Sequence, residues 1–209
     1  MKLVKIILAL LLFSIIISGQ GFEGFVKYKM ESEDETMFMK YFKKGESVRM
    51  EPEMEGAMGG AVLFKDGKTF MLMPQQNMYM EFNMDEYEDI EAEEENFKEP
   101  VKTGETKDIL GYTSEKWIFE DEEHTTEVWA AKGLGEFIFM STPMGQQDMP
   151  KWYKDLSSGG FFPMLIIARD KAGKVDGRME VVEIKEQNVP SNMFEIPSNY
   201  QKFSMPGGF

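Results

Sequence analysis

Cysteine is absent from this chain of 209 residues, and His124 is its only histidine. Without cysteine the protein cannot form a disulfide or use a thiol nucleophile, and a single histidine cannot supply the histidine pair of a zinc enzyme. His124 lies in an acidic turn, which is typical of a solvated loop residue. The sequence also lacks a Gly-rich phosphate loop and a Gly-x-Ser-x-Gly nucleophile elbow. We therefore expect no enzymatic activity, no catalytic residue and no cofactor.

Positive charge is scarce, since 23 Lys and Arg stand against 37 Asp and Glu and give a net charge of −14. Such a surface repels phosphate backbones and anionic lipid head groups, which excludes nucleic-acid binding and polybasic membrane docking. The acidic residues are densest from 85 to 99, where nine of fifteen residues are Asp or Glu. This segment is typical of a solvated linker or exposed helix, and a calcium site or a contact with a basic protein partner are the alternatives.

Long hydrophobic runs are also missing. The longest, residues 6–17, is interrupted by Ser14 and falls short of the roughly 20 apolar residues that cross a membrane. Lys2 and Lys5 precede this run, and Ser18 and Gly19 follow it, which is the pattern of a secretory signal peptide. We expect residues 1–20 to be a signal peptide and residues 21–209 to form one exported domain, periplasmic or extracellular, that is not membrane-anchored after cleavage.

The rest of the chain mostly alternates apolar and polar residues in short runs separated by Gly, Asp, Asn and Pro, which predicts β-strands. Asp66-Gly67, between two such runs, is typical of a tight hairpin turn. The expected strands span residues 26–30, 37–42, 47–54, 61–64, 69–73, 78–82, 101–109, 114–119, 125–131, 162–169 and 178–185.

The best helical stretch runs from residue 135 to 160. Met149, Trp152, Tyr153 and Leu156 recur there at the spacing of one helix face, and Gly159-Gly160 suits a helix end. One or two amphipathic helices in this region would need a sheet face to cover, which indicates an α+β fold.

Methionine is abundant where leucine is rare, because 18 methionines but only six leucines follow residue 20. Three Met-x-Met pairs fall in expected strands, where the period of two points both side chains of a pair to one face. Three interpretations stay open: plain core filling, a flexible apolar cavity, or Cu(I) binding by thioethers. The candidate ligand-binding residues are these methionines and the aromatic residues around the helical stretch: Met37, Met39, Met71, Met73, Met78, Met80, Trp152, Tyr153, Phe161 and Phe162.

Two sequence blocks, KTGETKDILGYTSEKWIFEDEEHTTEVWAAKGLG at 102–135 and DKAGKVDGRMEVVEIKEQNVPSNMFEIPSNY at 170–200, resemble the exported bacterial family named domain of unknown function 4412. The closing pattern Pro190-x-x-x-Phe194-x-Ile196-Pro197-x-x-Tyr200 is also similar to the end of proteins with the lipoprotein-carrier fold, and its apolar residues could cover a sheet edge. That resemblance implies an open, strongly curved antiparallel sheet whose concave face is covered by helices and holds acyl chains. We expect this sheet to have roughly nine to eleven strands, with one or two helices from residues 135 to 160 on its concave face.

From these features we expect a protein that binds an apolar small molecule, a lipid or a lipidated polypeptide in a cavity lined by methionine and aromatic residues. The alternative is an envelope protein-interaction or sensing module that binds no small molecule and uses the acidic segment 85–99. A third hypothesis is Cu(I) binding by the set Met37, Met39, Met71 and Met73.

Overall fold

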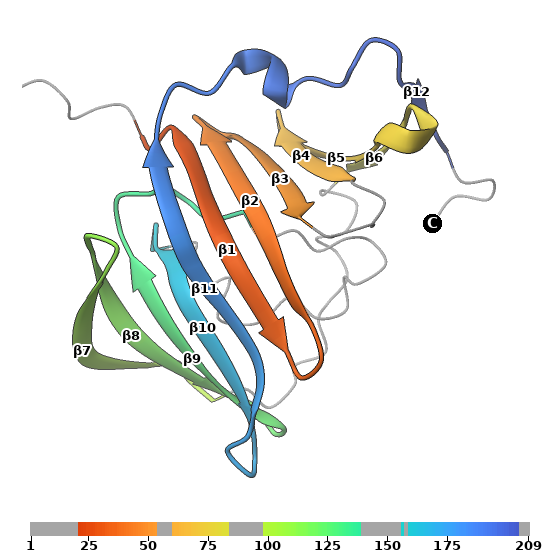
Figure 1. Ribbon diagram of the computed structural model, residues 1–209. Coiled ribbons are helices and arrows are strands. Elements are labelled where there is room, and N and C mark those ends of the chain that lie inside the picture. Colours follow the sequence, from red (N-terminus) through yellow and green to blue (C-terminus); the bar gives the residue numbers. More distant parts are fainter. Residues whose placement is uncertain (1–20, 54–59, 84–97, 139–155, 157–158, 205–209) are drawn as a thin grey trace, which may run out of the picture.

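The computed structural model describes residues 21–53, 60–83, 98–138, 156 and 159–204. Twelve strands in this part of the chain form one continuous sheet in the order β12-β6-β5-β4-β3-β2-β1-β11-β10-β9-β8-β7 (Figure 1). All neighbours are antiparallel except β12 and β6, which are parallel. The strands are β1 Gly24–Ser32, β2 Thr36–Lys44, β3 Ser47–Glu53, β4 Ala61–Lys65, β5 Lys68–Met73, β6 Met78–Asn83, β7 Val101–Ile109, β8 Tyr112–Glu120, β9 His124–Ala131, β10 Phe162–Asp170, β11 Val175–Glu186 and β12 Gln201–Lys202.

The tight turns of the sheet follow from residues that tolerate a positive φ. Asp66 and Gly67 have φ values of 52° and 74°, and they join β4 to β5 in a two-residue hairpin. Both angles lie in the left-handed region that such a turn needs, which confirms the hairpin predicted from this residue pair.

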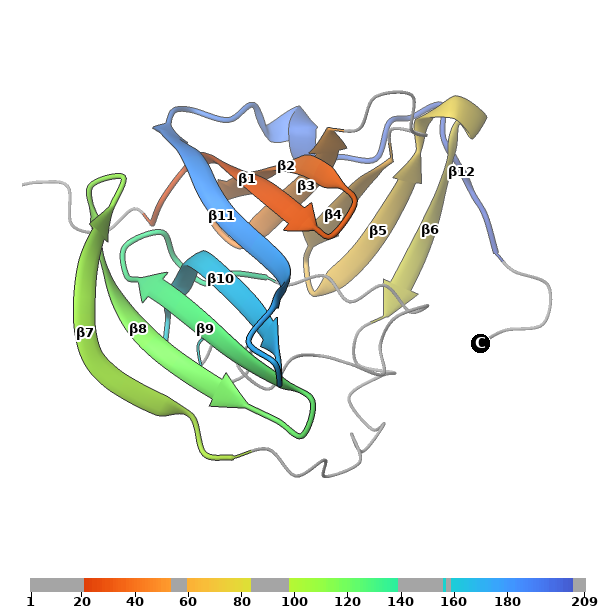
Figure 2. The same ribbon diagram turned by 60° about the horizontal axis from the view of Figure 1, so that its bottom comes forward.

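The sheet is strongly curved, so that β7–β9 and β5–β6 incline toward one another (Figure 2). One hydrophobic cluster joins residues of β1–β3 with residues of β8–β11, and we call the face that carries it the concave face. The opposite, convex face carries two separate clusters, one around Phe42 and Leu63 and one around Trp129 and Leu165. In β10, residues 162–167 are all buried because both faces of this strand are covered.

The C-terminal segment after β11 passes the ends of β1–β4 before it reaches β12 (Figure 1). Phe194 is 3% exposed and packs with Phe42, Leu63 and Val189 on the convex face. The sequence pattern suggested that Phe194 covers a sheet edge, but it covers a face, because the convex side of β2 and β4 carries apolar residues. The strand β12, directly after Tyr200, lies at the edge and pairs with β6.

The open, curved antiparallel sheet expected from the resemblance to lipoprotein carriers is what the structure has, but with twelve strands rather than nine to eleven. The sequence pattern missed β12, which consists of two residues. The described helical elements other than Leu156 are two 3₁₀ turns, η2 (Pro74–Gln76) and η5 (Ser191–Phe194), and η5 packs on the convex face.

The helix predicted between residues 135 and 160 falls mostly outside the described residues. Residues 135–138 are not helical, whereas Leu156 is helical and 1% exposed in the concave cluster. The predicted signal peptide, residues 1–20, also lies outside them. Within the described ranges, no helix has the length and apolar character needed to cross a membrane.

Candidate ligand-binding face of the sheet

The six methionines of the Met-x-Met pairs share one face of the sheet. Residues directly opposite each other in antiparallel strands point to the same side. Met39 lies opposite Tyr28, and Met71 lies opposite both Val62 and Met80. The pairings from β2 through β3, β4 and β5 to β6 contain no β-bulge, so one face of the sheet can be followed across all five strands. All six side chains are half-buried and lie on the concave face: Met37, Met39, Met71, Met73, Met78 and Met80.

The predicted aromatic members of the site occupy the other side of the concave face. Phe161 and Phe162 are 7% and 0% exposed and belong to the main hydrophobic cluster. Strands β1 and β11 lie between β10, which begins at Phe162, and β2, which carries the first Met-x-Met pair. The Phe162 ring nevertheless reaches Tyr41 on β2, with ring centroids 5.6 Å apart, and Met39 packs against the same hydrophobic cluster. Trp152 and Tyr153 lie outside the described residues.

A tightly packed aromatic cluster fills the middle of the concave face. The ring of Phe137 lies 5.1 Å from that of Phe162 and 5.2 Å from that of Tyr41, measured between ring centroids. The Tyr28 hydroxyl donates to the Pro163 carbonyl oxygen at 3.0 Å. Burial raises the pKa of the Tyr28 hydroxyl well above 10.0, so this hydroxyl stays protonated as a donor at neutral pH.

A second aromatic group lies on the concave face of β8. The rings of Trp117 and Phe119 are parallel with centroids 6.2 Å apart, and Phe161 meets the Trp117 ring edge-on at 5.4 Å. The ammonium groups of Lys102 and Lys132 lie 4.2 Å and 4.6 Å from the centroids of Trp117 and Phe161, respectively. Trp117 and Phe119 share a face because they are two residues apart on β8, whereas Phe161 and the two lysines join them from other parts of the chain.

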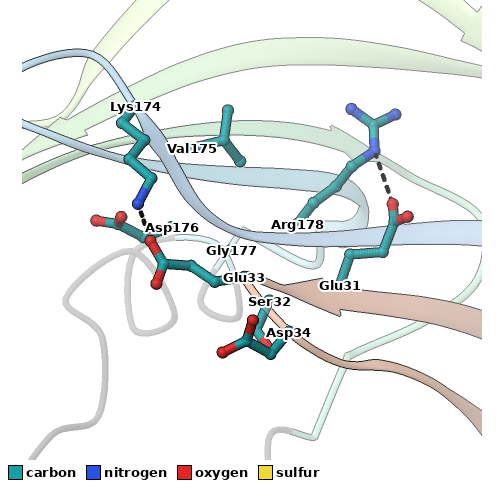
Figure 3. A pocket seen from close by; sticks show the side chains of 9 residues that line it. All are labelled: Glu31, Ser32, Glu33, Asp34, Lys174, Val175, Asp176, Gly177 and Arg178. Carbon is teal, nitrogen blue, oxygen red and sulfur yellow. Dashed lines mark hydrogen bonds and ion pairs between the residues drawn. The ribbon is translucent and has the colours of Figure 1, made fainter.

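A polar pocket of about 610 Å³ lies between the turn after β1 and the turn before β11 (Figure 3). Lys174 points to Glu33 and forms an ion pair with it, and Arg178 pairs with Glu31 at 3.8 Å and with Glu180 at 2.7 Å. Both cations of the pocket are thus already neutralised. The lining residues are Glu31, Ser32, Glu33, Asp34, Lys174, Val175, Asp176, Gly177 and Arg178.

His124 connects two turns near this pocket. Its Nε2 lies 3.6 Å from Asp176 Oδ2, and its Nδ1 lies 3.8 Å from Asp121 Oδ1. Lys171 Nζ also donates to the Asp121 carbonyl oxygen, at 2.6 Å. His124 is partly exposed and lies between two carboxylates at the start of β9.

A smaller groove of about 370 Å³ lies on the convex face beside the β4–β5 hairpin and η5. Its apolar residues include Phe70, Phe194 and Ile196, and its rim carries Lys65 and Lys68. Neither this groove nor the polar pocket includes any residue of the predicted ligand site. The acidic segment predicted to contact a basic partner, residues 85–99, lies outside the described residues except for its last two.

Solved structures with a similar fold share little sequence with this chain. An uncharacterized conserved protein from Thermus thermophilus has 12% identity and a TM-score of 0.52, over 87% of this chain and 90% of its own. A chain of the Pseudomonas aeruginosa MucA/MucB complex has 11% identity and a TM-score of 0.50, with 89% and 59% covered. PNGF-II has 14% identity and a TM-score of 0.50, with 88% and 31% covered.

This chain thus spans less than two thirds of the matched MucA/MucB and PNGF-II chains, and at these identities the likeness concerns the fold alone. No curated protein matches the sequence. A family model described as "Domain of unknown function (DUF4412)" matches residues 22–200, which include both sequence blocks that carried the family resemblance. The chain belongs to the DUF4412 family.

Proposed function

We propose that this protein binds an apolar ligand, a lipid or a lipidated polypeptide on the concave face of its sheet. The observation that carries the proposal is the register of β2 to β6, which aligns six half-buried methionines on that face. If the signal peptide is removed on export, the ligand is met outside the cytoplasm.

Methionine suits such a surface for a physical reason. Its unbranched, polarizable side chain can re-pack around ligands of different shape at small cost. Half-buried thioethers also leave apolar area that a ligand can remove from water, at about 25 cal/mol for each Å² buried. The packed rings of Tyr41, Phe137 and Phe162 provide a rigid wall beside the methionine strands.

The proposal is tested with an apolar probe and two matched sets of substitutions. N-phenyl-1-naphthylamine is titrated into the full chain, and organic extracts of natively purified protein are analysed by mass spectrometry. The double variant Met71→Gln and Met80→Gln should weaken probe binding about tenfold, which corresponds to 1.4 kcal/mol. Met193 is half-buried on the convex face, and Met193→Gln should leave probe binding unchanged. Clean extracts together with no probe binding would contradict the proposal.

The alternative is an envelope protein-interaction or sensing module, in which the acidic segment 85–99 binds a basic protein. The net charge of −14 supports this alternative, since it favours cationic partners. Deletion of residues 85–97 should then abolish co-purification of such a partner and leave the far-ultraviolet spectrum of the sheet unchanged. Co-purification that survives the deletion would exclude this role for the segment.

The hypothesis of one Cu(I) site on Met37, Met39, Met71 and Met73 has no support from the register. Two strands, β3 and β4, lie between β2 and β5. With neighbouring strands about 4.8 Å apart, the two Met-x-Met pairs are separated by about 14 Å, which is too far for one ion to bind all four sulfurs. Anaerobic Cu(I) titration against a weak chelator tests whether any methionine set competes.

A further inference from the structure

The indole nitrogen of Trp117 is a buried hydrogen-bond donor without an acceptor. Trp117 is 4% exposed, and its Nε1 is the only buried side-chain nitrogen or oxygen without a partner in the part of the chain that the structure describes. Buried tryptophans usually find a partner for this group, and an unpaired buried donor destabilises the folded state. Such a group in a folded protein calls for an explanation.

Trp129 shows that the same sheet can satisfy a tryptophan. Trp129 lies on β9 and packs on the convex face, and its Nε1 donates to Glu127 Oε1 at 2.6 Å. Both tryptophans have a lysine ammonium near the ring, at 4.2 Å for Trp117 and 4.0 Å for Trp129. Both tryptophans are thus buried beside a lysine ammonium group, but only Trp129 has an acceptor for its Nε1.

Among the described residues no group accepts a hydrogen bond from Trp117 Nε1, and the side chains over its ring supply donors and apolar surface. Phe119 and Phe161 contact its ring, and Lys102 and Lys132 place ammonium groups over the Trp117 and Phe161 rings. An ammonium group can only donate hydrogen bonds. Neither lysine forms an ion pair with any carboxylate of the described ranges, although the chain has 37 acidic residues.

We propose that the concave face at Trp117 binds the polar end of an amphiphile, with a carbonyl or carboxylate oxygen of the ligand accepting the hydrogen bond from Trp117 Nε1. The apolar body of the ligand packs on Phe119 and Phe161. Lys102 and Lys132 add positive charge at the same end and favour a carboxylate over a neutral ester. This inference rests on the proposed apolar-ligand binding and names the chemical class of that ligand.

The test compares ligands with and without an oxygen acceptor. Dodecanoate and methyl dodecanoate compete with N-phenyl-1-naphthylamine, which contains no oxygen, for the full chain and for two variants. Trp117→Phe removes the N–H and keeps an aromatic ring, so it should weaken both competitors about tenfold relative to the oxygen-free probe. Trp129→Phe should change neither. Competition by both compounds at wild-type strength in Trp117→Phe would overturn the inference and leave apolar binding intact.

A second measurement, by nuclear magnetic resonance, is made on the wild-type protein and does not depend on the binding affinity of a variant. The indole N–H resonance of Trp117, assigned by its absence from the spectrum of Trp117→Phe, should move downfield when the wild-type protein is saturated with dodecanoate. The probe should not produce this shift. An unmoved resonance at saturation overturns the inference, whereas a wild-type protein that binds neither the probe nor the competitors overturns the proposed function itself. Dodecanoate and its methyl ester also separate a free carboxylate from an esterified acyl group as the source of the oxygen.

The two lysines give a charge-specific control. Replacing both Lys102 and Lys132 by Met removes the ammonium groups and keeps unbranched apolar side chains over the rings. This double variant should weaken dodecanoate severalfold relative to methyl dodecanoate. Equal affinity ratios in the wild type and in the double variant would show that the lysines do not bind the ligand and would overturn their assigned role.

Discussion

The Tyr28 hydroxyl hydrogen-bonds to the Pro163 carbonyl oxygen at 3.0 Å, although β11 separates the strands that carry these residues. The pairing of β10 with β11 begins only at Leu165, and the pairing with β9 is irregular between Pro163 and Leu165. The Tyr28 side chain therefore supplies a donor to a carbonyl at the irregular start of β10. The buried Tyr28 side chain thus links β1 to β10 across the concave face.

Replacing Tyr28 by Phe removes this donor and should lower the free energy of unfolding by about 1–3 kcal/mol, the cost of leaving a buried carbonyl unpaired. The measurement is urea denaturation at pH 7 followed by tryptophan fluorescence. Tyr79→Phe is the control, because Tyr79 is half-buried on the convex face and its hydroxyl has no hydrogen bond within the described ranges. Equal losses in both variants would contradict a special role for the Tyr28 hydroxyl.

The same tyrosine should make the protein sensitive to alkali. Burial, helped by the nearby Tyr41, raises the pKa of Tyr28 well above 10.0 in the folded state. The unfolded state therefore loses this proton first, so the stability that the neutral hydroxyl provides is present below about pH 10 and falls as the pH rises further. The gap in unfolding free energy between wild type and Tyr28→Phe should narrow between pH 10 and 11. A gap that stays constant over this range would show that Tyr28 is not protected from ionisation.

Most strands could be predicted from the sequence because their signals are local. Alternating burial along β1 and the turn at Asp66-Gly67 depend on neighbouring residues in the chain, and both are as expected. The strand β12 was missed because its two residues carry no periodic pattern and pair in parallel with β6. Such pairing depends on where the C-terminal segment ends in space, which no local pattern encodes.

The candidate site likewise has features that local spacing predicts and features that depend on the whole fold. Residues that are two positions apart in one strand lie on the same face, so the methionine pairs were recognisable from their spacing alone. Which strands become neighbours is a property of the whole sheet, and this decides that Met71 lies opposite Met80 while Met39 lies opposite Tyr28. The unpaired Trp117 nitrogen was beyond sequence reasoning, because a missing acceptor follows only from the positions of all surrounding side chains.

Lys43 should be a source of instability at neutral pH. It lies on β2, is 6% exposed and packs its Cε close to Gly135, and burial lowers its pKa below the ordinary 10.5. The unfolded state thus binds the proton more strongly than the folded state, so the wild type gains stability as the pH rises toward 10.5. Lys43→Met should raise the free energy of unfolding at pH 7 by about 1 kcal/mol, since it removes a desolvated polar group.

The control for this substitution is Lys185→Met, at an exposed position of β11. It should change the free energy of unfolding by less than about 0.5 kcal/mol, as surface substitutions do. The gain from Lys43→Met should shrink as the pH rises toward and above 10.5, because the folded-state lysine loses its buried charge before the unfolded-state lysine does. A gain that is independent of pH would show that packing rather than charge sets the effect.

The C-terminal segment is held to the convex face by polar contacts as well as by packing. Lys44 Nζ donates to the Val189 carbonyl oxygen at 2.7 Å, and the Val189 N–H donates to Glu23 Oε1 at the same distance. Arg49 Nη1 donates to the Met193 carbonyl oxygen at 3.0 Å. These side chains satisfy backbone groups that have no strand partner, so the segment has a fixed path over β2 and β3.

Phe194 is the main apolar anchor of this path, and Phe194→Ala should lower the free energy of unfolding by about 3–5 kcal/mol, the usual cost of removing a buried Phe ring. Phe203→Ala is the matched control, because Phe203 is 40% exposed and should lose less than about 1 kcal/mol. Urea denaturation measures both, and limited proteolysis should cut Phe194→Ala between residues 187 and 200 sooner than the wild type. If Phe194→Ala unfolds at the wild-type urea concentration, the convex face does not depend on this segment, and the polar contacts of Lys44 and Arg49 alone hold it in place.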